Sequence, residues 1–214
     1  MAGIYIHIPF CKSRCAYCDF FSSTHLSYKS KLVACLCNEL ISEKHYIGNE
    51  AIETIYFGGG TPSLLEENDF KLIFDTIQAT YDTSNCVEIT IEVNPDDVTN
   101  DFVLMLKKFP FNRISIGIQS FINNELKLIN RRHTSEQAIE AVQLFQRNDY
   151  ENISVDLIYG YPSQDINNLS TSVDKLLKMK IQHISAYHLT YEKGTVLHQK
   201  LINNEVQAVD EETS

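Results

Sequence analysis

The stretch 87-VEITIEVN-94 alternates strictly between apolar and polar residues. Because successive side chains of a strand point to opposite faces, this segment is predicted to be a strand with one apolar and one polar face. The segments 113-RISIGIQ-119 and 154-SVDLIY-159 repeat the pattern. Strands of buried parallel sheets are usually apolar on both faces. The polar face therefore predicts a lumen lined for a polar ligand, and an antiparallel sheet with one wet face is the alternative.

Six such segments alternate with amphipathic segments of helical length. The expected strands are residues 3–8, 54–57, 87–93, 113–119, 152–159 and 183–189. Their spacing of roughly 30 residues is typical of parallel strands joined by helical crossovers. A complete eightfold barrel needs ~250 residues. The 214 residues therefore predict an α/β chain folded as a partial (β/α)6 TIM-like barrel, with a flat doubly wound sheet as the alternative.

Three helix starts are predicted from capping residues. Ser63 with Glu66, and Thr134 with Gln137, have the spacing of capping boxes. Thr99 is predicted to cap a helix that buries apolar residues as far as position 109.

Composition excludes several classes of function. The net charge of −10 argues against a nucleic-acid surface. No apolar run approaches the ~20 residues that span a bilayer, and the first residues lack the features of a signal peptide. We therefore expect a reducing, cytoplasmic location, where six cysteines are thiols or metal ligands. Cys35, Cys37 and Cys86 are interpreted as small buried residues, and the seven histidines as structural.

The stretch 11-CKSRCAYC-18 places Cys11, Cys15 and Cys18 directly after the first expected strand. A closed zinc site takes four ligands, and no second cysteine pair matches. Three thiolates with an open fourth position suit a 4Fe–4S cluster that has one iron free to bind another group. The C-terminal ends of barrel strands are where such folds build their sites.

A glycine-rich segment, 56-YFGGGTPS-63, follows the second expected strand. It matches neither a Walker A loop nor a dinucleotide fingerprint. Glycines let the backbone approach a ligand closely, and a helix start at Pro62–Ser63 would present free N–H groups to a carboxylate. A plain tight turn is the alternative.

Taken in order, "YIHIPFCKSRCAYCDF", "GGGTP", "IEVNPDD", "SIGIQSF", "INRRHT", "VDLIYGYPSQ" and "HISAYHLTYEKGT" resemble the radical S-adenosylmethionine (SAM) enzymes. The resemblance is to the family of oxygen-independent coproporphyrinogen III oxidases, and it covers nearly the whole chain. It implies a radical SAM core domain over residues 1–200. Residues 201–214 would begin a linker to a C-terminal helical domain that the chain lacks.

The resemblance also implies roles for individual residues. Cys11, Cys15 and Cys18 would hold a 4Fe–4S cluster, whose fourth iron would bind SAM. The residues implied to contact SAM are Tyr5, Tyr17, Gly59, Gly60, Thr61, Glu92, Gln119, Arg131 and Asp156. Glu92, Gln119 and Asp156 are also the polar-face residues of the expected strands.

One residue bears on the branch of the family. The motif typical of the oxidases is C-x3-C-x2-C-x-C, with a further cysteine two positions after the third. In this sequence that position is Phe20. "CAYCDF" and "AYHLTYEKGT" resemble instead the HemW branch, the haem chaperones. This implies haem or a porphyrinogen as cargo, haem-accepting protein partners, an electron donor such as a flavodoxin or ferredoxin, and membrane contact only through a partner.

Three functions remain open at this point. A haem chaperone would bind haem without turning over porphyrinogen, although SAM cleavage stays compatible with it. An oxygen-independent oxidase would decarboxylate coproporphyrinogen. A non-catalytic zinc or thiol module would be colourless and free of sulfide.

Overall fold

The fold is built on six parallel strands in the order β1-β2-β3-β4-β5-β6. The computed structural model describes residues 2–48, 50–162 and 164–210. The strands are β1 Ala2–Ile8, β2 Ile52–Gly59, β3 Glu88–Val93, β4 Arg113–Gln119, β5 Ile153–Tyr159 and β6 His183–His188. All six predicted strands are confirmed, each within two residues at either end.

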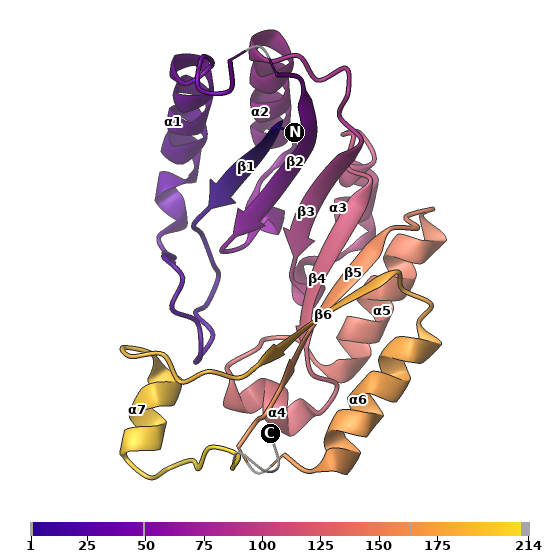
Figure 1. The fold of residues 1–214 in the computed structure, drawn as a ribbon. Coiled ribbons are helices and arrows are strands. Elements are labelled where there is room, and N and C mark those ends of the chain that lie inside the picture. The colour runs from indigo at the N-terminus through magenta and orange to yellow at the C-terminus, as the bar shows by residue number, and fades with distance from the viewer. Residues whose placement is uncertain (1, 49, 163, 211–214) are drawn as a thin grey trace.

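The helices cover one face of a curved sheet. The α-helices are α1 Lys29–Ser42, α2 Glu67–Thr80, α3 Asn100–Leu106, α4 Asn123–Leu128, α5 Ser135–Arg147, α6 Ile166–Lys178 and α7 Val196–Ile202. Figure 1 shows α1, α2, α3, α5 and α6 along one side of the strands, and α4 and α7 near the strand ends. A doubly wound sheet reverses its strand order and has helices on both faces. The sequential order here therefore confirms the partial barrel and excludes the flat alternative.

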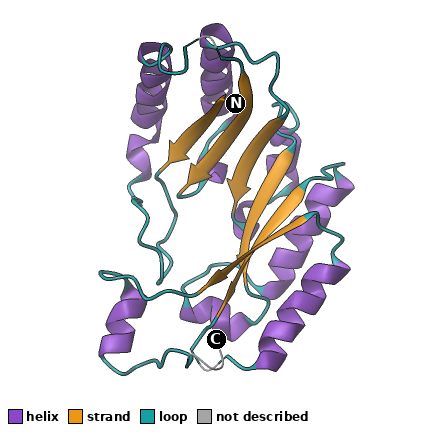
Figure 2. Cartoon of the chain, in the orientation of Figure 1, coloured by secondary structure: helices purple, strands orange, loops and turns teal. Residues whose placement is uncertain are grey.

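Hydrogen bonds do not close the barrel. Within the described residues β1 and β6 stand at the two ends of the strand order. Figure 2 shows the strands pointing toward the same end of the molecule, where long loops gather. That end presents the carboxyl ends of the strands, which is where the predicted site lies.

Helix starts were predicted with mixed success. Thr134 and Gln137 form the predicted capping box of α5, and the Thr99 side chain accepts from the N–H of Phe102 at the start of α3. The box at Ser63 and Glu66 is wrong. Residues Pro62–Leu64 form a short 3-10 turn, and α2 begins at Glu67 with Glu66 as its N-cap. α3 is also shorter than predicted, because it ends at Leu106.

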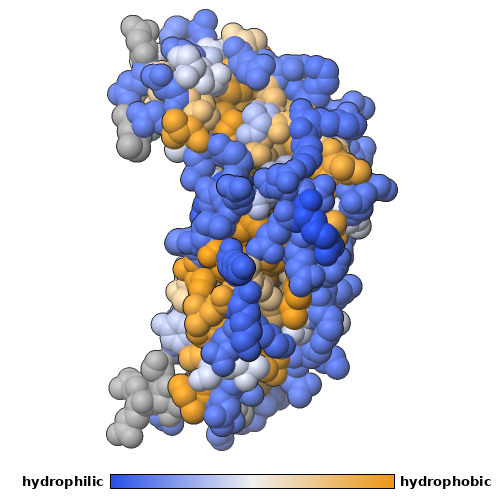
Figure 3. All heavy atoms as spheres, turned by 90° about the vertical axis from the view of Figure 1, so that its right-hand side faces the viewer, coloured by the Kyte–Doolittle hydropathy of each residue, from blue (hydrophilic) through white to orange (hydrophobic). Residues whose placement is uncertain are grey.

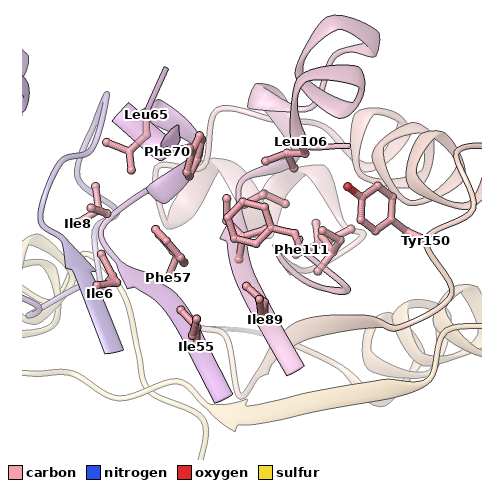
Figure 4. Packing of buried hydrophobic residues seen from close by; sticks show 14 of the residues in the cluster. Ile6, Ile8, Ile55, Phe57, Leu65, Phe70, Ile89, Leu106, Phe111 and Tyr150 are labelled. Atoms are coloured by element: carbon pink, nitrogen blue, oxygen red, sulfur yellow. The ribbon is translucent and has the colours of Figure 1, made fainter. Parts of the chain in front are cut away.

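The core lies between the sheet and its helices. Phe57 on β2 packs against Phe70 and Phe74 of α2, with ring centroids 5.9 and 5.3 Å apart, and against Phe111 at 5.2 Å. Figure 4 shows Phe57, Phe70 and Phe111 with four isoleucines that project from neighbouring strands: Ile6, Ile8, Ile55 and Ile89. The apolar strand face is thus the helix-covered exterior, as the alternation predicted.

The outer surface is ordinary for a folded domain. Hydrophilic residues cover most of the face seen in Figure 3, and hydrophobic residues form patches on it. In the described part of the chain, no helix combines the length and apolarity that crossing a membrane requires. Among the scattered cysteines Cys37 is buried and Cys86 partly buried. Cys35 is exposed, so the prediction of burial was wrong there.

Candidate functional site

The cysteine loop follows β1 and is closed at its base. Cys11 N–H donates to the carbonyl of Ser23 at 3.0 Å, and Ser23 N–H donates to that of Pro9 at 2.7 Å. These bonds hold the two ends of residues 9–23 together, so that the segment forms a closed loop. The loop begins directly after β1 and lies over the carboxyl ends of the strands.

Its middle is anchored to the far strands. Ala16 is buried, its N–H donates to the carbonyl of Ile129 at 2.9 Å, and its carbonyl accepts from Leu197 N–H at 2.8 Å. Ala16 belongs to a small apolar cluster separate from the main core: Ala16, Ile129, Ile158, Tyr161, Leu189 and Leu197. The loop consequently bridges the strand ends between β1 and the β5–β6 side.

The three thiols are free and half-buried. Within the described residues, no three histidine, cysteine or acidic side chains converge as ligands of a single metal ion. A closed zinc site takes four protein ligands. A 4Fe–4S cluster takes each thiolate on a different iron, so three thiolates leave one iron open. The three half-buried thiols on one loop are a donor set that fits such a cluster.

A cavity of about 490 Å³ lies beneath the loop. Its lining unites nearly all the predicted site residues: Cys11, Cys15, Tyr17, Cys18, Gly59, Gly60, Thr61, Glu92, Gln119, Arg131 and Asp156. The walls come from β2 through β6, from the cysteine loop after β1 and from the loops after β2, β3, β4 and β6. Tyr5 is the predicted residue that does not line it. Its ring is 57% exposed, and its hydroxyl lies 3.0 Å from Nδ1 of His7.

The glycine segment brings backbone close to both the cysteines and the carboxylate wall. Gly59 has φ +105°, which favours glycine, and its N–H donates to Oε2 of Glu92 at 3.1 Å. A Cβ on Gly60 would lie 3.0 Å from Sγ of Cys11 and 2.7 Å from the carbonyl of Phe10. Gly60 is therefore needed for the cysteine loop to approach the end of β2.

Two carboxylates line the polar wall. Glu92 accepts from the Tyr56 hydroxyl at 2.7 Å, and burial raises its pKa. Burial, with the nearby charge of Glu92, raises the pKa of Asp156 to about 6. Carboxylates in such surroundings are suited to accepting hydrogen bonds from hydroxyl or amino groups of a polar ligand.

Gln119 reaches the cavity through a backbone irregularity. The register between β4 and β5 shifts between Gly117 and Gln119, and Gln119 has φ +72°. Bulges commonly re-aim side chains near functional sites. The buried side chain of Gln119 therefore lines the cavity at the point where β4 ends.

Arg131 supplies a positive charge beside the thiols. Nη1 donates to Sγ of Cys15 at 3.5 Å, and Nη2 donates to the Gly117 carbonyl and, at 2.7 Å, to Oδ1 of Asn94. A guanidinium beside a sulfur stabilises the thiolate that iron binding requires. Nε is buried and, among the described residues, has no hydrogen-bond partner. Arg131 as a whole lines the cavity and adds a positive charge to its wall.

An ion-pair network secures the rim. Asp97 has a buried carboxylate that accepts from Lys12 at 2.6 Å, from Arg132 at 3.3 Å and from the Ser63 hydroxyl at 2.9 Å. Arg132 also pairs with Asp96. The network joins the cysteine loop to the segments after β2, β3 and β4. The Ser63 hydroxyl is therefore part of this network and does not cap a helix.

Several lining residues were not predicted. Asn94, Ile158, Tyr187 and His188 line the cavity, and Tyr56 holds Glu92. Asn94 and Tyr56 could have been predicted as site residues, because period-two alternation places each on the polar face of its strand. His133, predicted to be structural, is buried and its Nε2 lies 3.0 Å from the Ile118 carbonyl, whereas its buried Nδ1 has no partner among the described residues.

Known proteins share this sequence and fold. HemW proteins, named haem chaperones, from Lactococcus lactis and Escherichia coli are 36% identical over 192 residues and 34% identical over 200 residues. The matches cover 90% and 91% of this chain but 50% and 52% of those proteins. The chain therefore spans about half the length of these curated relatives.

A solved structure gives the same picture of the fold. Coproporphyrinogen III oxidase (HemN) from Escherichia coli, described as a radical SAM enzyme, superposes with a TM-score of 0.85 at 21% identity. The superposition covers 99% of this chain and 49% of that one. The family model of the Radical SAM superfamily matches residues 5–176. With six parallel strands and three cysteines on the loop after β1, the chain belongs to the radical SAM superfamily.

Proposed function

We propose that this chain is the radical SAM core of a haem chaperone. In this proposal Cys11, Cys15 and Cys18 hold a 4Fe–4S cluster, and SAM occupies the cavity beneath them. The observation that carries the proposal is the shared lining: the three thiols face the same 490 Å³ cavity as Glu92, Arg131 and Asp156. When bound and reduced, such a cluster supplies the electron that cleaves the SAM sulfonium.

The protein's own groups divide the work of binding. The Gly59–Thr61 segment and the guanidinium of Arg131 are suited to the amino-acid end of SAM, because they offer close backbone and a positive charge. Glu92 and Asp156 are suited to its hydroxyl and amino groups. Tyr17 and the buried side chain of Gln119 also line the cavity. Tyr5 stands outside the lining, next to Gly58 and Glu92, and would contact only a ligand that extends toward β1.

Relatives named haem chaperone favour haem as the cargo, and haem-accepting proteins as the partners. Phe20 supports the same choice. It occupies the position of the last cysteine in the C-x3-C-x2-C-x-C motif of the oxidases. Phe20 lines the cavity and is 64% exposed. A flavodoxin or ferredoxin would reduce the cluster in the cytoplasm.

The likeness to coproporphyrinogen III oxidase keeps the oxidase as a second candidate. The two functions differ in one assay. A chaperone is expected to bind haem, seen as a Soret shift during titration, and to leave coproporphyrinogen unchanged under anaerobic, reducing conditions with SAM. Formation of protoporphyrinogen in that mixture would contradict the chaperone proposal and favour the oxidase.

The ligand assignment has its own test. Cys15→Ala is expected to lose iron, sulfide and the brown colour after anaerobic reconstitution, because one cluster ligand is gone. Cys35→Ala is the matched control, since Cys35 is an exposed cysteine on α1 outside the cavity lining. Retention of iron and sulfide in Cys15→Ala would contradict the assignment.

A further inference from the structure

Two of the three cysteines are linked by a continuous path of hydrogen bonds. Thr61 Oγ1 donates to Sγ of Cys11 at 3.5 Å, and Arg131 Nη1 donates to Sγ of Cys15 at 3.5 Å. Between these two donors stands Asn94. Its Nδ2 donates to Thr61 Oγ1 at 3.0 Å, and its Oδ1 accepts from Arg131 Nη2 at 2.7 Å.

The direction of each bond follows from the chemistry of the groups. A guanidinium has only donors, so the Asn94 oxygen must face Arg131 and the amide nitrogen must face Thr61. The threonine hydroxyl then accepts from Asn94, which leaves its single proton for the sulfur of Cys11. One amide therefore orients the donors to both sulfurs without touching either.

The backbone around Asn94 is arranged for this use. Asn94 is the N-cap of the 3-10 turn Pro95–Asp97, a position where asparagine side chains usually bond to the turn. Here the side chain makes no capping bond. It is committed to Thr61 and Arg131 instead. Arg131 is also held by the Gly117 carbonyl, and a Cβ on Gly117 would lie 3.2 Å from Nη2.

We propose that Asn94 is a positioning residue that sets the hydrogen bonds to Cys11 and Cys15 and thereby tunes the reduction potential of the cluster. This inference rests on the proposed cluster. Hydrogen bonds to cluster sulfurs stabilise the more negative, reduced state and raise the potential. Removing the amide frees both donors to turn away, so the potential falls.

Substitutions separate the two arms of the path. Asn94→Leu removes both contacts. Thr61→Val removes only the donor to Cys11. Because the Thr61 donor depends on Asn94, the double variant is expected to have the potential of Asn94→Leu alone, which is a non-additive result in a double-mutant cycle. Asn148→Leu is the control, since that partly buried asparagine donates through Nδ2 to the Leu144 carbonyl at 2.9 Å and lies outside the cavity lining.

The experiment is a redox titration followed by electron paramagnetic resonance, on anaerobically reconstituted wild type and the four variants, with iron and sulfide measured on each. We expect full iron content and a lower potential in Asn94→Leu and Thr61→Val, with Asn148→Leu at the wild-type value. Potentials equal to wild type in both would overturn the inference and leave the proposed function standing. If Asn94→Leu holds no cluster, Thr61→Val decides between the same two outcomes. A wild type that takes up no cluster would overturn the proposed function, and the inference with it.

Discussion

At the scale of one residue, Asp156 shows that the ionised site costs the folded protein stability. Its carboxylate is largely buried near the carboxylate of Glu92, and these surroundings raise its pKa from 3.8 to about 6. Glu92 itself is satisfied by Tyr56 and Gly59. A ligand that donates to Asp156 would relieve part of this cost, which the folded protein otherwise carries.

The raised pKa predicts a pH dependence of stability. Below about pH 4 both folded and unfolded forms of Asp156 hold the proton. Between about pH 4 and about pH 6 the unfolded chain releases it and the folded chain keeps it, so stability falls as pH rises. Asp156→Asn is therefore expected to be more stable than wild type at about pH 7, on the order of 2 kcal/mol, and to lose that advantage below about pH 4.

Urea unfolding at both pH values measures the difference. Asp149→Asn is the control, because the Asp149 side chain is 91% exposed, pairs at the surface with Lys107 and lies outside the cavity lining. An Asp156→Asn protein with no gain at the higher pH would show that burial and Glu92 do not destabilise the ionised form.

At the scale of elements, the site depends on the close approach of two segments after neighbouring strands. The cysteine loop follows β1, and the glycine segment ends β2. These strands pair in register from Gly3 with Thr54 to Ile8 with Gly59. The Gly60 N–H then donates to the Ile8 carbonyl at 2.8 Å, which continues the pairing into the loops.

Gly60→Ala is expected to disturb this approach. The new Cβ would lie 2.7 Å from one backbone oxygen and 3.0 Å from Sγ of Cys11, so the cysteine loop must shift. We expect iron content after reconstitution to fall several-fold while the far-ultraviolet circular dichroism is retained.

Gly48→Ala is the matched control. A Cβ there meets nothing within 4 Å, although φ is +64°, so it is expected to cost some stability and no iron. Full iron loading in Gly60→Ala would contradict the role given to this glycine.

For the whole molecule, the open barrel is bridged by the cysteine loop. β1 and β6 stand at opposite ends of the strand order. The loop after β1 nonetheless bonds through Ala16 to residues after β4 and at the start of α7. The small apolar cluster around Ala16 therefore couples the cluster-binding loop to the last third of the chain.

Leu197→Ala tests this coupling. Leu197 is fully buried in the small cluster, and its truncation is expected to cost about 2–5 kcal/mol and to loosen the loop. Leu176→Ala removes an equally buried leucine from the main core and serves as the control. We expect lower iron content in the first variant than in the second at equal loss of stability. Equal iron content in both would contradict the coupling.

The sequence predicted the strands and the barrel type, because period-two alternation is a local signal and the spacing of the segments indicates helical crossovers. Alternation also placed Glu92, Gln119 and Asp156 on the polar face, and the resemblance supplied the other predicted residues of the cavity lining. Details that depend on tertiary contacts were missed. Ser63 looks like a helix cap, but it is drawn to the buried carboxylate of Asp97. The bulge that turns Gln119 inward depends on pairing with β5. The placement of Asn94 between Thr61 and Arg131 joins three separate loops, which no sequence window contains.

The most direct test of the cluster site is electron paramagnetic resonance of the anaerobically reconstituted, dithionite-reduced protein with and without SAM. We predict a 4Fe–4S signal that changes when SAM is added, because three thiolates leave one iron open to the ligand. A protein without a cluster, or a cluster signal that SAM leaves unchanged, would contradict the account.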